Sequence, residues 1–240
     1  MKRMIPIIAA ALLLLSGTLL AACGIGEVPP EPDEKVYGEA DGSIYIYANS
    51  AVTDVFVTDF DTAKYDLDEF KGYLVQDIEA YNASAAFTPQ KTETTEEGET
   101  IEPPIRYSKP VEIKSMTAKD GKMNLQLLYA TPADFFAWQK LYDEDAFSAR
   151  HGSVLKTGKF LDDPSLQTKT FVNREGEPIE MEKFLEKKYI EDVRYVTSDV
   201  AGLLFSDGAI IGYTEGASLD SEKNCFNVKG GQAITVLYYK

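Results

Sequence analysis

Serines and acidic residues are plentiful in this sequence, but they form no recognisable pattern for acid–base or nucleophilic chemistry. His151 is the only histidine, and Gly152 follows it. A serine hydrolase pairs such a histidine with a serine and an acid, but no Gly-x-Ser-x-Gly turn accompanies it here. One histidine and two cysteines also fall short of the ligand set of a typical zinc site. We therefore interpret His151 as a surface-loop residue.

Two short motifs overlap just after this histidine. Ser153 and Lys156 match Ser-x-x-Lys, and Lys156 to Gly158 matches Lys-Thr-Gly. These patterns resemble motifs of penicillin-binding proteins and β-lactamases, in which different lysines on distant elements serve the two motifs. Here one lysine would serve both, and no Ser-Asp-Asn lies between them. We interpret the match as coincidental.

Acidic side chains gather between positions 59 and 69. Clusters of carboxylate oxygens suit hard cations such as Ca²⁺. An EF-hand loop counted from Asp59 would need glycine and glutamate where the sequence has Lys64 and Phe70. We expect these acids to cap a helix instead, and a Ca²⁺ site remains the alternative. The five acids are Asp59, Asp61, Asp66, Asp68 and Glu69.

Aromatic side chains are abundant, with 14 tyrosines and 12 phenylalanines. Tyr45 and Tyr47 share one face of the first predicted strand. Such faces can hold sugars or peptides. We interpret this face as a second side of the sheet, covered by a helix, with surface recognition as the alternative. Trp138, the only tryptophan, is expected in the core.

The first 22 residues have the order of a secretory signal peptide. Lys2 and Arg3 precede an apolar run from 5 to 15, and small residues follow it. The run is too short for a permanent transmembrane helix. We therefore exclude this segment from the fold.

The end of this segment, Leu20-Ala21-Ala22-Cys23, resembles the lipobox of bacterial lipoproteins. The resemblance implies that the Cys23 thiol receives a diacylglycerol and that the chain is cut after Ala22. It also implies the extracytoplasmic face of the cell membrane, because two or three acyl chains attach a protein stably to a lipid bilayer.

Cys225 then lacks an intrachain partner for a disulfide. It lies in an alternating, strand-like segment from 224 to 228. A reactive thiol needs a nearby cation or base. We expect a buried, structural thiol.

The formal net charge of −15 excludes most nucleic-acid binding, which requires basic residues to neutralise phosphates. Two segments hold much of the negative charge. Residues 23–42 form an acidic, proline-rich tether, and residues 88–104 form a second acidic stretch that we expect to be a flexible insertion.

The remaining sequence, 43–240, is predicted to form a single α+β domain. Strands at 43–49 and 52–60 precede a helix whose apolar face runs from Leu67 to Tyr81. A hairpin turning at Asp120-Gly121 precedes a second helix after Pro132. A third helix is expected at 180–188.

The last fifty residues are predicted to form a β-meander. Its strand segments are 192–198, 201–205, 209–213, 223–228 and 232–239, and Asp207-Gly208 and Gly230-Gly231 are the expected tight turns. We expect a largely antiparallel sheet carrying about three helices, because no alternation of strands and helices indicates a parallel one.

These features favour a binding or scaffolding module at the cell envelope over an enzyme. The chain resembles small lipoproteins of unassigned function from Gram-positive, clostridia-like bacteria. Its partners would be the bilayer, through acylated Cys23, and a protein, peptide or glycan ligand. No residue pattern predicts a cofactor. An envelope hydrolase with a site assembled by folding and a transporter's substrate-binding lipoprotein remain the alternatives.

Overall fold

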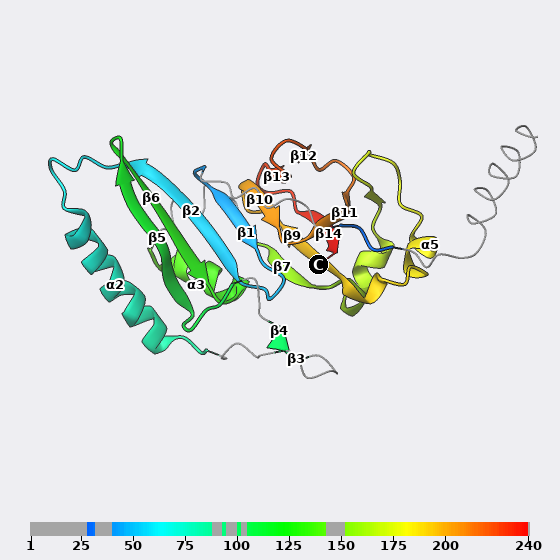
Figure 1. The fold of residues 1–240 in the computed structure, drawn as a ribbon, viewed down its shortest axis with the longest axis horizontal. Helices are drawn as coiled ribbons and strands as arrows, with labels where there is room; N and C mark the ends of the chain where they lie inside the picture. The colour runs from blue at the N-terminus through cyan, green and yellow to red at the C-terminus, as the bar shows by residue number, and fades with distance from the viewer. Residues whose placement is uncertain are drawn as a thin grey trace, which may run out of the picture.

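The computed structural model describes residues 28–31, 40–87, 93–94, 100–101, 105–142 and 152–239. Within these residues the strands form two main sheets (Figure 1). The larger sheet has seven strands in the order β12-β13-β10-β1-β2-β6-β5. Its strands are β1 (Ser43–Ile46), β2 (Val52–Asp59), β5 (Val111–Lys119), β6 (Lys122–Tyr129), β10 (Gly202–Ser206), β12 (Leu219–Asp220) and β13 (Cys225–Val228).

The second sheet has five strands in the order β7-β9-β14-β11-β8. All of its pairings are antiparallel. Its strands are β7 (Leu155–Lys159), β8 (Phe171–Val172), β9 (Val193–Ser198), β11 (Ala209–Thr214) and β14 (Ile234–Tyr239). A separate short pair consists of β3 (Glu93–Thr94) and β4 (Thr100–Ile101).

Within the described ranges, three α-helices accompany the sheets, which confirms the predicted α+β class. They are α2 (Leu67–Ser84), α3 (Pro132–Tyr142) and α5 (Met181–Leu185). Three single turns of 3-10 helix lie near α5 in the fold: η1 (Phe160–Asp162), η2 (Pro164–Thr168) and η3 (Ile190–Asp192).

The main core lies between the two sheets and continues beneath α2 and α3. Ile44 reaches it from the seven-stranded sheet and Val236 from the five-stranded sheet, and both are almost fully buried. A second cluster, containing Phe160 and Phe184, covers the outer face of the five-stranded sheet. Burial of apolar area on this scale is the dominant stabilising term of a fold.

The β5–β6 hairpin forms where the sequence predicts it. Asp120 has a φ of 51° and Gly121 a φ of 73°, as a two-residue turn with a twist matching its strands requires. Lys119 and Lys122 pair directly on either side of this turn.

Helix α2 begins at the predicted cap. The Asp66 carboxylate accepts hydrogen bonds from the backbone N–H groups of Asp68 at 2.8 Å and Glu69 at 3.0 Å. The predicted apolar face is only half buried, however: Ile78 and Tyr81 are buried, whereas Phe70 is 41% exposed. The first half of α2 extends beyond the core.

Helix α3 carries aromatic side chains into the core, and the prediction that Trp138 lies there is confirmed. Phe135 and Trp138 are buried, and the Trp138 ring packs edge-on against Tyr81 at 5.7 Å between centroids. Leu141 is exposed instead. The third helix, α5, ends at Leu185 and is shorter than the predicted 180–188.

The C-terminal strands lie close to their predicted positions, but their connections differ from a simple meander. Asp207-Gly208 joins β10 of the seven-stranded sheet to β11 of the other, and Gly230-Gly231 joins β13 to β14 in the same way. The prediction that these turns close hairpins is therefore wrong. Both faces of these strands are apolar, so each can pack in either sheet, and a tight turn alone does not fix the pairing.

One pairing in the seven-stranded sheet is parallel. Ser43 to Ile46 of β1 align with Leu203 to Ser206 of β10. This pairing places an N-terminal strand beside a C-terminal one, so the two halves of the described chain share one sheet.

Candidate functional site

Several predicted site residues lie outside the described residues. They are Leu20, Ala21, Ala22 and Cys23 of the lipobox, together with His151. Their predicted roles stay predictions.

The Ser-x-x-Lys serine occupies a structural position. The Ser153 hydroxyl donates to Asp199 Oδ2, and the backbone N–H groups of Ser153 and Val154 donate to Oδ1 at 2.9 and 2.8 Å. Burial raises the pKa of Asp199, but these hydrogen bonds outweigh burial and lower it. Ser153 precedes β7 rather than opening a helix, so its arrangement differs from the motif it resembles.

The acids between 59 and 69 do not converge on one site in the described structure. Asp59 Oδ1 lies 2.6 Å from Lys122 Nζ, which lowers the pKa of Asp59. Asp61 pairs with Lys64 at 3.1 Å. The described part of the chain contains no group of three or more His, Cys, Asp or Glu residues placed to hold a metal ion. Asp66 performs the capping role predicted for this cluster.

Cys225 is a buried, free thiol, as predicted. Burial, with a smaller contribution from Asp220, raises its pKa to about 11. The thiolate is therefore scarce near neutral pH.

The face bearing Tyr45 and Tyr47 is buried, so it does not offer the alternative recognition surface. Tyr45 stacks on Phe205 with 4.5 Å between ring centroids. Ile105 and Tyr107 pack against this cluster, whereas the sequence predicted a covering helix. The cover is thus an irregular segment leading into β5.

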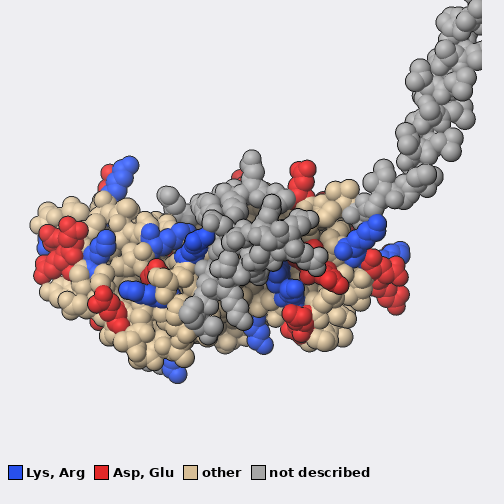
Figure 2. All heavy atoms as spheres, turned by 60° about the horizontal axis from the view of Figure 1, so that its bottom comes forward, with Lys and Arg blue, Asp and Glu red and all other residues tan. Residues whose placement is uncertain are grey.

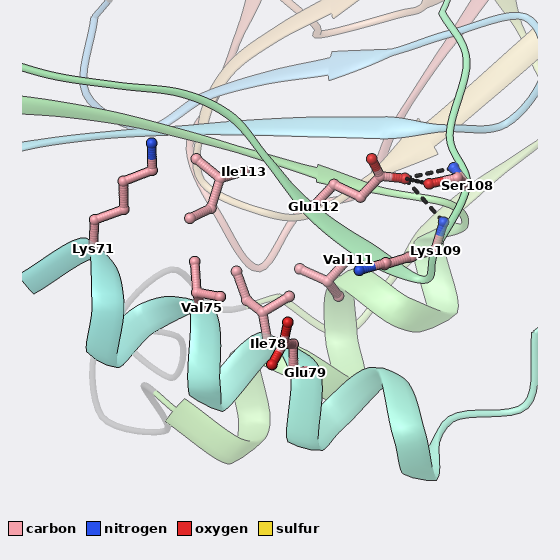
Figure 3. Close-up of a pocket in the computed structure, with 9 residues that line it drawn as sticks. All are labelled: Lys71, Val75, Ile78, Glu79, Ser108, Lys109, Val111, Glu112 and Ile113. Atoms are coloured by element: carbon pink, nitrogen blue, oxygen red, sulfur yellow. Dashed lines mark hydrogen bonds between the residues drawn. The ribbon is translucent and has the colours of Figure 1, made fainter. Parts of the chain in front are cut away.

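The described surface does contain a groove, between α2 and the beginning of β5 (Figure 3). Its volume is about 320 Å³. Val75 and Ile78 of α2 converge on Val111 and Ile113 of β5 and form an apolar floor (Figure 3). Ile78 and Val111 are buried, so the floor is continuous with the main core.

Charged side chains border this floor. Lys71 lies toward one end of the groove and Lys109 toward the other, and Glu79 lies on α2 between them (Figure 3). Glu112 is already engaged: its Oε1 accepts from the backbone N–H of Lys109 at 2.9 Å and from Ser108 N–H and Oγ–H. An apolar floor with a few polar groups at its margin is the usual construction of a ligand site.

Asn82 fixes α2 beside β5. Its side-chain Nδ2 donates to the Val111 carbonyl and its Oδ1 accepts from the Val111 N–H, both at 2.9 Å. One side-chain amide thereby satisfies both backbone groups of an edge residue. This contact sets the separation between the helix and the strand next to the groove.

No protein-family model, curated protein or solved structure matches this chain. Among the described residues, no helix combines the length and apolar character needed to cross a membrane. What this site can bind is therefore indicated only by the residues that line the groove.

Sequence reasoning did not identify the groove. The floor residues were visible as apolar positions of a predicted helix and a predicted strand, but no sequence signal states that these two elements lie side by side. Asn82 is a polar residue close to the apolar face of α2. Its position indicates that this part of the helix contacts polar groups, which the structure shows to be the backbone of Val111.

Proposed function

We propose that the protein is a lipid-anchored binding module at the extracytoplasmic face of the cell membrane, and that the groove between α2 and β5 is its ligand site. The groove carries this proposal, because it joins an apolar floor, partly exposed at Val75 and Ile113, to separated positive charges at Lys71 and Lys109. The lipobox resemblance at Cys23 supplies the anchor.

The position of the tether supports this arrangement. In Figure 1, residues 28–31 lie in the half of the molecule that holds β11 and α5, whereas α2 and β5 occupy the opposite end of the long axis. An anchor at Cys23 would leave the groove at the end farther from the attachment point. A ligand in the envelope could then reach it.

The two alternatives have less support. The main core includes residues of both sheets and of α2 and α3, unlike the two lobes around a cleft of a transporter's binding protein. Ser153, the serine of the hydrolase motif, gives its hydroxyl to Asp199.

The anchor is tested with Cys23→Ser in cells that can acylate lipoproteins. We expect an uncleaved precursor without acyl label, whereas the wild-type chain is cleaved and labelled with radioactive palmitate. Normal processing and labelling of the variant would refute the anchor.

The site is tested with two variants of equal net charge on neighbouring positions of α2. Val75→Glu places a carboxylate in the groove, and Gln76→Glu places one at an exposed position outside it. Binding of the full-length proteins to delipidated envelope fractions, which leave no bilayer for acylated Cys23 to enter, should fall at least tenfold for Val75→Glu only. Equal binding of all three proteins, with matching thermal midpoints, would exclude the groove.

A further inference from the structure

The groove is bounded on one side by the edge of a sheet. β5 is the last strand in the order of the seven-stranded sheet, and β6 is its only strand partner among the described residues. We infer that the groove binds an extended polypeptide segment that adds a strand to β5; this inference rests on the proposed function of the groove.

Asn82 shows that this edge accepts an amide partner. In an antiparallel pair, alternate residues direct both backbone groups away from the existing neighbour. Val111 does so, and its N–H and C=O are taken by the Asn82 amide at 2.9 Å each. Asn82 thus occupies the place of a paired residue from a further strand.

Ile113 is the next residue in the same alternation, and it lines the groove. Its pairing with Leu127 lies just before a bulge in the β5–β6 ladder. Among the described residues, no hydrogen bond occupies the backbone groups of Ile113 that face away from β6. Open backbone groups of this kind are satisfied by a polypeptide, whose N–H and C=O groups repeat at the same spacing.

The floor defines the side chains of the bound segment. A strand directs every second side chain to the same face. A segment lying on β5 would therefore place alternate side chains against Val75 and Ile113, which are apolar and partly exposed in the groove, next to the buried Ile78. Apolar residues at alternate positions match this floor.

Charge defines the ends of the bound segment. Lys71 and Lys109 lie at separate ends of the groove. Glu112 is engaged by Ser108 and Lys109, and Glu79 is the remaining carboxylate of the lining. Basic and acidic side chains are interspersed over both halves of the molecule (Figure 2), so the positive charge at the groove is that of Lys71 and Lys109. Acidic residues flanking the apolar positions would pair with them.

The experiment uses a fluorescein-labelled heptapeptide, Asp-Val-Thr-Val-Thr-Val-Asp, and the full-length protein. We expect saturable binding in fluorescence anisotropy, weakened at least tenfold by Val75→Glu and unchanged by Gln76→Glu. Replacing both aspartates of the peptide by asparagine should weaken binding severalfold at low salt, and Lys71→Gln should reduce that difference.

Backbone methylation separates strand addition from simple occupancy of the groove. N-methyl groups on the three valines block one edge of the extended peptide, and N-methyl groups on the two threonines block the other. Strand addition predicts at least a tenfold loss for one series and a change of less than threefold for the other. Equal effects of the two series would overturn strand addition.

Other outcomes are equally decisive. If methylation has no effect while Val75→Glu abolishes binding, the groove remains a site and strand addition fails. Absence of saturable binding at millimolar peptide overturns the inference, while the envelope-binding experiment still decides the proposed function. A dimer in light scattering that Val75→Glu abolishes and the peptide does not dissociate would assign the edge to a second copy of this chain.

Discussion

At the scale of single residues, several carboxylates in this protein organise the backbone around them. Asp66 receives two N–H groups at the start of α2, and Asp199 receives two N–H groups at the start of β7. Glu112 does the same for the turn at Ser108 and Lys109. Acidic composition, which in the sequence could indicate metal binding, here serves local structure at these positions.

Replacing the cap residue of α2 should destabilise the fold. Asp66→Ala leaves the N–H groups of Asp68 and Glu69 without their acceptor, and losses of about 0.5–2 kcal/mol are typical of such changes. Urea denaturation should show a lower midpoint with an unchanged slope. Asp66→Asn retains an acceptor oxygen and should stay close to the wild type; equal losses in both variants would argue against capping.

Asp199 should contribute a pH-dependent share of stability. Its folded pKa is lowered from the ordinary 3.8, so its ionised form stabilises the fold above that pH, and this contribution is lost as the pH falls through the folded pKa. Asp199→Asn should cost about 1–3 kcal/mol at pH 7. The difference from wild type should shrink below pH 3.8. A constant difference from pH 7 to pH 2 would contradict this assignment.

At the scale of elements, local signals in the sequence identify what each segment is, but not which segment it contacts. Asp120-Gly121 and Asp66 act over a few residues, and both predictions are confirmed. The parallel pairing of β1 with β10 and the groove depend on segments far apart in the sequence. Alternation of apolar residues indicates the buried faces of a strand, whereas the neighbour is chosen by tertiary packing.

The last strand should be indispensable. β14 lies between β9 and β11 in the centre of the five-stranded sheet, and Val236, Leu237 and Tyr238 are fully buried. Deleting residues 233–240 should abolish the cooperative thermal transition in circular dichroism, because it exposes two strands and the main core. Deleting Lys240 alone is the control. An unchanged transition after the larger deletion would refute this role.

At the scale of the whole molecule, the described parts behave as one packed unit. The seven-stranded sheet joins strands from both ends of the chain, and the main core contacts both sheets and two helices. Neither half buries its apolar surface without the other. Stability is therefore expected to be shared across the molecule.

Two probes in different regions can test whether the molecule unfolds as one cooperative unit. Trp138 lies beneath the α2 end of the seven-stranded sheet, and Cys225 is buried on the outer face of that sheet. In a Cys23→Ser background, tryptophan fluorescence and pulsed thiol labelling of Cys225 should give the same urea midpoint. Cys225 should stay unlabelled below that midpoint, because its pKa is about 11 and it is buried. Separate midpoints would show that the two regions unfold independently.

The parallel pairing of β1 with β10 also sets an order of events in time. Ser43 is synthesised early, but its partner Leu203 follows only after most of the chain. Until then β1 lacks one of its two neighbours, and its apolar residues must stay out of contact with other chains. Long-range pairings of this kind slow folding, because a large loop must close before they form. The N-terminal strand is thus the first part of the fold to appear and among the last to be completed.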